Sequence, residues 1–113
     1  MRKNPKLFGD HSEEVALGFL RDEGFLILET NYFARKLGEI DIIAQKDEVL
    51  HFIEVKSAKA NFDPIYNLTT SKLKKIIKSA NYYLKVKKLD LALCIDAIII
   101  RNEELEFIEN ITV

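Results

Sequence analysis

The sequence has one cysteine, two prolines, four glycines and no tryptophan, and its formal net charge is only −1. A single cysteine, Cys94, excludes a disulfide framework, so we expect a small buried side chain in a reducing compartment. No apolar run approaches the about 20 residues that span a membrane. No apolar stretch follows the basic residues near the N-terminus, so we expect no signal peptide and a cytoplasmic location without membrane contact.

The chain has 113 residues, 48% of them hydrophobic, which predicts a single domain over residues 1–113 with one core. Its 17 basic and 18 acidic residues nearly balance, so the overall charge does not indicate a partner. Their distribution is uneven, because residues 64–89 contain no acidic side chain but seven lysines: Lys72, Lys74, Lys75, Lys78, Lys85, Lys87 and Lys88. This stripe can bind a polyanion, or it can be the solvated face of an amphipathic helix. The sequence leaves both interpretations open.

Periodicity predicts a helix, three strands, a second helix and then one or two strands. A first helix begins near Asp10, which can cap it with Glu13 as the partner of a capping box, and Gly24 ends it. A second helix begins at Thr70 or Ser71. The predicted strands cover residues 25–28, 39–45, 49–56, 91–100 and 105–108, with a polar loop over 31–37. The strand at 91–100 is apolar on both sides, which is typical of an interior, parallel strand. We therefore expect an α/β protein with a mixed sheet flanked by helices.

The chemistry is concentrated in two neighbouring strands, Gly38-Glu39-Ile40-Asp41-Ile42-Ile43-Ala44 and Phe52-Ile53-Glu54-Val55-Lys56. If Asp47-Glu48 forms a tight two-residue turn, opposed residues have numbers with a constant sum, and Asp41 lies across from Glu54. Their Cβ atoms would then be about 4.5–5.5 Å apart. Two facing carboxylates repel each other, and a hard cation such as Mg²⁺ between them would remove that repulsion.

Three further groups extend this candidate metal site. Lys56 lies two residues after Glu54, on the same face, where its ammonium can orient a metal-bound water or stabilise a phosphate. The backbone carbonyl of Val55 is a possible oxygen ligand. Glu13, in the first turn of a helix, is a third carboxylate, which can bind the metal through water or hold a second cation.

The same residues can also have ordinary structural roles. Glu39 falls opposite Lys56 and the two can form a simple ion pair, which contributes little. Glu13 can be only a capping residue, and Asp41 can lie at a solvated sheet edge. All three explanations would have to hold together on one face, so we favour the functional interpretation.

The pattern Asp41…Glu54-Val55-Lys56 resembles the PD-(D/E)xK motif of restriction-endonuclease-like nucleases. Together with Glu13-x-x-Ala16, Gly24-Phe25, Lys72 and Ala80-x-x-Tyr83-Leu84, it resembles the small bacterial YraN family, which is similar in pattern to Holliday-junction resolvases. The resemblance covers nearly the whole chain, although Ile40 stands in place of the motif's proline. It implies an αβββαβ core, a nucleic-acid partner, a Mg²⁺ or Mn²⁺ cofactor, and catalytic roles for Glu13, Asp41, Glu54 and Lys56.

We therefore expect an endonuclease acting on structured or branched DNA, which would need a homodimer to cut a junction symmetrically. The alternatives are a non-catalytic nucleic-acid-binding or partner-docking module and a purely structural domain. The expected nucleic-acid contacts are all basic: Arg35, Lys36, Lys59, Lys72, Lys74, Lys75 and Lys78. His51 lies on the strand face opposite Glu54 and is expected in the core. Asp96, in an apolar strand, is expected to make a structural hydrogen bond.

Overall fold

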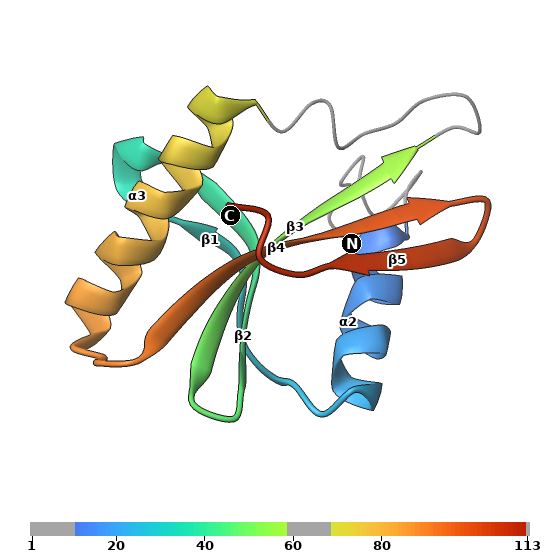
Figure 1. Ribbon diagram of the computed structural model, residues 1–113, viewed down its shortest axis with the longest axis horizontal. Helices are drawn as coiled ribbons and strands as arrows, with labels where there is room; N and C mark the ends of the chain where they lie inside the picture. Colours follow the sequence, from blue (N-terminus) through green and yellow to red (C-terminus); the bar gives the residue numbers. More distant parts are fainter. Residues whose placement is uncertain (1–10, 59–68, 113) are drawn as a thin grey trace, which may run out of the picture.

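A computed structural model describes residues 11–58 and 69–112 (Figure 1). Two helices and five strands follow one another in the predicted order. They are α2 (Ser12–Asp22), β1 (Leu26–Phe33), β2 (Glu39–Lys46), β3 (Val49–Ala58), α3 (Thr70–Lys87), β4 (Ala92–Arg101) and β5 (Glu104–Ile108), with the 3₁₀ turn η1 (Arg35–Leu37) before β2. None of the helices in these ranges is both long and apolar enough to cross a membrane.

The five strands form one mixed sheet in the order β1-β2-β3-β4-β5. Strands β3 and β4 are parallel, and the other three pairs are antiparallel. A parallel pair needs a crossover, and α3 lies in that connection, so the predicted βαβ unit is confirmed. The α/β fold class, with a mixed sheet flanked by helices, is confirmed as well (Figure 1).

The two helices cover opposite faces of the sheet. Ala80 and Tyr83 of α3 are buried in one apolar cluster with Phe52 of β3. Ala16 and Leu20 of α2 are buried in a second cluster, which contains Ile53, the next residue of the same strand. Successive residues of a strand point to opposite faces, so each helix packs on its own side of β3.

Three local predictions need correction. The residue before α2 is His11, which makes no side-chain capping bond, and Asp10 lies outside the described residues. The cap of α3 is Thr69, one residue earlier than expected, and its hydroxyl accepts a hydrogen bond from the Lys72 N–H at 3.3 Å. Strand β1 continues to Phe33, through half of the predicted loop. This part of β1 lies in an edge strand that pairs with β2 alone, and Asn31 and Phe33 in it are exposed to solvent.

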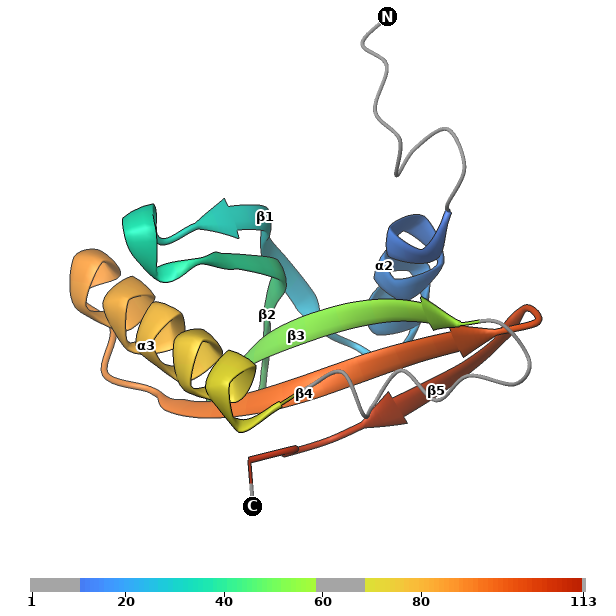
Figure 2. The ribbon, with the colours of Figure 1, turned by 90° about the horizontal axis from the view of Figure 1, so that it is seen from above.

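Strands β2 and β3 separate at their middle. Their ladder runs from the pair Lys46–Val49 to the pair Ile42–Ile53 and stops there. Ile42 is buried in the α2 cluster, whereas Ile40, two residues earlier, is buried in the α3 cluster. A regular strand would place both on one face, so β2 bends at the residue between them, Asp41. Figure 2 shows β1 and the first part of β2 apart from β3.

Candidate metal and nucleic-acid site

Asp41 and Glu54 meet where β2 and β3 separate. The observed ladder has the constant sum expected for a two-residue turn at Asp47 and Glu48, with Asp47 in the left-handed conformation at φ 56°. Asp41 and Glu54 directly follow the last pair. The Val55 N–H donates to Asp41 Oδ2 at 2.9 Å, and the Asp41 N–H donates to Glu54 Oε2 at 3.4 Å. Each carboxylate thus binds the backbone of the other strand, and the predicted juxtaposition is confirmed.

Burial makes this carboxylate pair electrostatically demanding. Asp41 is only 8% exposed, so its placement at a solvated sheet edge is wrong. Burial, and then the nearby charge of Asp41, raise the pKa of Glu54 to about 7, although Lys56 acts in the opposite direction. One of the two carboxyl groups therefore holds a proton readily near neutral pH. A divalent cation between them would take the place of that proton.

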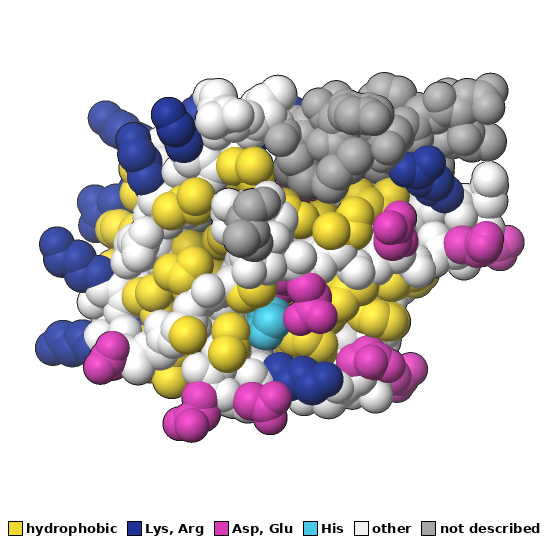
Figure 3. Space-filling model, in the orientation of Figure 1, with side chains coloured by type: hydrophobic (Ala, Val, Ile, Leu, Met, Phe, Trp, Pro, Cys, Tyr) yellow, Lys and Arg dark blue, Asp and Glu magenta, His cyan; other side chains and the backbone are white. Residues whose placement is uncertain are grey.

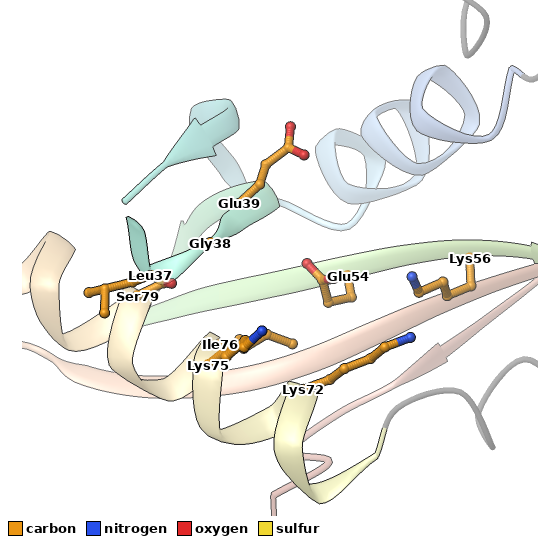
Figure 4. Close-up of a pocket in the computed structure, with 9 residues that line it drawn as sticks. All are labelled: Leu37, Gly38, Glu39, Glu54, Lys56, Lys72, Lys75, Ile76 and Ser79. Carbon is orange, nitrogen blue, oxygen red and sulfur yellow. The ribbon is translucent and has the colours of Figure 1, made fainter. Parts of the chain in front are cut away.

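A cavity of about 210 Å³ opens beside Glu54 (Figure 4). It has room for several water molecules. Lys56 extends along β3 toward Glu54, while Lys72 and Lys75 reach the same space from α3. Glu39 also lines the cavity, but the ladder ends before Glu39 and Lys56 could pair in it. The remaining lining residues are Leu37, Gly38, Ile76 and Ser79. We call Asp41, Glu54 and Lys56, with this cavity, the fork site.

Glu13 reaches the neighbourhood of the fork site through a residue that the sequence did not single out. Asn31 Nδ2 donates to Glu13 Oε1 at 2.8 Å. The pairs Thr30–Ile42 and Tyr32–Ile40 place Asn31 across from Asp41 in the β1–β2 ladder. Asn31 has a φ of 51°, which redirects its side chain, and asparagine is one of the few residues that adopt this conformation without glycine's freedom. The position of Asn31 beside Asp41 follows from the pairing of β1 with β2, which was not predicted from the sequence.

The predicted nucleic-acid contacts divide into two groups. Lys72 and Lys75 line the cavity of the fork site, whereas Lys74 and Lys78 are exposed elsewhere on α3. Figure 3 shows basic side chains along the margin of the molecule where α3 lies. Arg35 and Lys36 are exposed on η1, next to the cavity residue Leu37, and Arg35 Nε donates to the Tyr82 hydroxyl at 3.0 Å. Lys59 lies outside the described residues.

The opposite face of β3 carries a second polar cluster. His51 is 6% exposed, as expected for a core histidine, and its Nδ1 hydrogen-bonds Asp96 Oδ2. The expected structural partner of Asp96 is therefore found. Cys94, predicted as a small buried side chain, is only half-buried, and its thiol donates a hydrogen bond to Asp96 Oδ1 at 3.0 Å. Nothing in the sequence indicated that His51, Cys94 and Asp96 are neighbours, whereas the fold brings the three side chains together.

Residues 12–100 match the family described as Uncharacterised protein family UPF0102. A UPF0102 protein of Sulfurovum is 67% identical over 112 residues, which cover 99% of each chain. A relative in Wolinella succinogenes is 59% identical over 104 residues, covering 92% of this chain and 94% of its own. One in Helicobacter pylori strain P12 is 55% identical over 104 residues, covering 92% and 90%.

Proposed function

The chain belongs to the UPF0102 family, and we propose that it is a metal-dependent endonuclease that hydrolyses phosphodiester bonds in structured or branched DNA. The observation that carries the proposal is the meeting of Asp41 and Glu54 at the point where two strands separate. A structural domain has no need of a buried carboxylate, Asp41, beside a second, partly buried one, Glu54. The lysine-lined cavity beside them adds a place for the substrate's phosphate.

The donor set of the fork site suits Mg²⁺ or Mn²⁺. Asp41 and Glu54 supply carboxylate oxygens, and Mg²⁺ is usually bound by one or two carboxylates together with waters and substrate phosphates. The Val55 carbonyl and Glu13 are further oxygen donors that we assign to the same ion or its waters. A bound ion would supply Lewis acidity and a more acidic water at the scissile phosphate.

The chain's own residues bind and orient the reactants. The ammonium of Lys56, on the same strand face as Glu54, orients the attacking water and stabilises the negative charge that develops on the phosphate. Lys72 and Lys75 neutralise the phosphate backbone from the other side of the cavity. Arg35 and Lys36 extend the basic surface along η1, and Lys74 and Lys78 extend it along α3.

A second candidate is a non-catalytic nucleic-acid-binding module. The observation that favours it is the lysine stripe of α3, since several of its side chains are exposed and lie outside the fork site. A binder that never cuts would use the stripe and leave the carboxylates unused. The two candidates therefore differ in what removal of Asp41 does.

The deciding experiment compares cleavage and binding of a four-way DNA junction in the presence of Mg²⁺ or Mn²⁺. We expect Asp41→Asn and Lys56→Ala to lower the cleavage rate by about 100-fold or more, because each removes a group that acts at the scissile phosphate. Binding, measured in Ca²⁺, should change by less than about tenfold. Lys85→Ala, at an exposed position of α3 away from the cavity, is the matched control and should cleave like wild type.

The outcomes separate the candidates. Wild-type protein that binds the junction but never cuts it would reject the nuclease and leave the binding module. Cleavage that survives in Asp41→Asn would show that another site, or a contaminant, is responsible. If wild type shows no salt-dependent binding at all, both candidates fail.

A further inference from the structure

The cluster formed by His51, Cys94 and Asp96, hereafter the His–Cys–Asp cluster, is built by the parallel pairing of β3 and β4. In that ladder His51 lies beside Cys94, and Ile53 lies beside Asp96. Cys94 and Asp96 are two residues apart on β4, so they share a face. One donor atom from each of the three side chains lies within 4.8 Å of the others. Three residues from two strands thus present nitrogen, sulfur and oxygen to a single point.

The hydrogen bonds of the cluster exclude nucleophilic catalysis by Cys94. Asp96 Oδ1 accepts from the Cys94 thiol and from the Asn110 N–H at 2.8 Å, while Oδ2 binds His51. The thiol proton is therefore directed at a carboxylate and not at the imidazole. Burial, this hydrogen bond and the charge of Asp96 raise the pKa of Cys94 to about 12. A nucleophilic cysteine needs the opposite environment.

A separate cavity gives solvent access to the cluster. It has a volume of about 430 Å³, and its lining includes His51, Cys94 and the carboxylate-bearing Glu109. An ion can therefore reach the three residues through this cavity. The cavity also carries one more oxygen donor, the carboxylate of Glu109. Glu109 lines the same cavity as Cys94 and His51, which makes its carboxylate a candidate fourth ligand.

We propose that His51, Cys94 and Asp96 form a zinc site, with Glu109 or a water molecule as the fourth ligand. Zinc accepts sulfur, nitrogen and oxygen together, whereas Mg²⁺ selects oxygen alone. A thiolate, a carboxylate and a neutral imidazole around Zn²⁺ carry no net charge, which suits a buried position. Binding releases the thiol proton to solvent, and a proton on His51 Nδ1 moves to Nε2 through solvent, so that the imidazole stays neutral with Nδ1 free to face the ion.

This site is independent of the proposed nuclease. His51 and Glu54 are three residues apart on β3 and point to opposite faces of the sheet. The ring of Phe25, from the α2 cluster, packs edge-on against His51 with 5.0 Å between ring centres. The two sites therefore share a strand but no ligand, and each can be removed without the other.

Cobalt is the probe for the test, because a Co²⁺–thiolate bond gives an intense near-ultraviolet absorption that oxygen ligands do not produce. We expect one equivalent of Co²⁺ to produce this band in the full chain and Zn²⁺ to abolish it. Cys94→Ser, which keeps a hydroxyl donor for Asp96, should lose the band and remain folded. His51→Gln should bind Zn²⁺ about tenfold or more weakly. Asp41→Asn, the control at the fork site, should give the wild-type band.

Thermal unfolding provides the second measurement. Zn²⁺ should raise the melting temperature of wild type and of Asp41→Asn, but not that of Cys94→Ser. A wild-type protein with no cobalt–thiolate band and no zinc-dependent shift would overturn the proposal and leave a purely structural hydrogen-bonded cluster. A band that survives in Cys94→Ser would overturn it as well, since Cys94 is the only cysteine.

Discussion

Strand β3 carries two polar clusters of opposite character, one on each face. At the fork site, oxygen groups of the same charge face each other, and the neighbouring lysines come from a helix across a cavity. In the His–Cys–Asp cluster, the carboxylate of Asp96 is fully buried and accepts hydrogen bonds from three chain groups. The first arrangement needs a cation or a proton to balance its charge, whereas the second is satisfied by the protein itself.

The two faces of β3 therefore support two different kinds of chemistry. The pleat directs Glu54 toward α3 and His51 toward α2, so the two clusters have separate surroundings. Separation of β2 from β3 exposes the first cluster to a cavity. Continuous pairing of β3 with β4 fixes the second, which a separate cavity reaches at His51 and Cys94. The predictions below test whether, in the metal-free protein, the Asp41–Glu54 pair is electrostatically strained while the His–Cys–Asp cluster stabilises the fold.

The largest expected difference is in stability. Asp96→Asn leaves one carbonyl oxygen for three buried donors and removes the charge that faces His51, which should cost about 3–5 kcal/mol. Asp41→Asn keeps an oxygen for the Val55 N–H and removes the repulsion with Glu54, so it should change stability by less than about 1 kcal/mol. Urea unfolding of both variants without metal measures the contrast. Equal losses would mean that the fork carboxylates are structural.

A smaller effect is expected in the pH dependence of stability. The pKa of Glu54 is raised to about 7 in the folded protein, so the folded state holds a proton that the unfolded state has already released. Stability is therefore full below about pH 4.5 and falls as the pH rises through 7. Glu54→Gln should remove this fall and gain up to about 3 kcal/mol over wild type above about pH 8.

Melting temperatures between pH 5 and 9 check this prediction without metal. Glu106→Gln, at an exposed position of β5, is the matched control and should follow the wild-type curve. If Glu54→Gln shows the same decline as wild type, the carboxyl group is not held in its protonated form, and the electrostatic contrast between the two clusters is lost.

The smallest expected effect is in the salt dependence of DNA binding. Lys72 lines the fork cavity, and Lys46 lines the cavity of the other cluster, so replacing either by alanine removes one positive charge. Lys72→Ala should reduce the slope of log K against log salt by about 0.9, the contribution of one phosphate contact, whereas Lys46→Ala should leave it unchanged. Titration of a labelled junction at several salt concentrations gives both slopes. A larger change in Lys46→Ala would place the DNA on the α2 face.

The fork site was predictable because a hairpin's register is local. The two-residue turn at Asp47 and Glu48 determines every pair before it, so Asp41 and Glu54 could be placed together from the sequence. Leu73, Ile76 and Ala80 recur with the helical period and pack in the α3 cluster, so the buried side of α3 can likewise be read from the sequence. The helical period of α3 did not show which of the seven lysines line the cavity, and the structure shows that Lys72 and Lys75 do.

The His–Cys–Asp cluster could not be predicted from the sequence, because the register that forms it is not local. A crossover separates His51 from Cys94, and no turn fixes the register of a parallel pair. The register of β3 and β4 depends on how the connecting helix α3 packs on the sheet. That packing involves the whole core. The second half of β1 was predicted as a loop, although its partners in β2 lie only six to twelve positions further along the chain, from the pair Phe33–Glu39 to the pair Thr30–Ile42.

The left-handed backbone of Asn31 has a consequence for association between molecules. Strand β1 forms one edge of the sheet, where unpaired backbone groups could accept a strand from another chain. The ladder of β1 shifts register between Ile27 and Glu29, and Asn31 then takes a φ of 51°. Both irregularities interrupt the row of N–H and C=O groups that an added strand would need. The residue that binds Glu13 thus also interrupts the edge along which a second chain could add a strand.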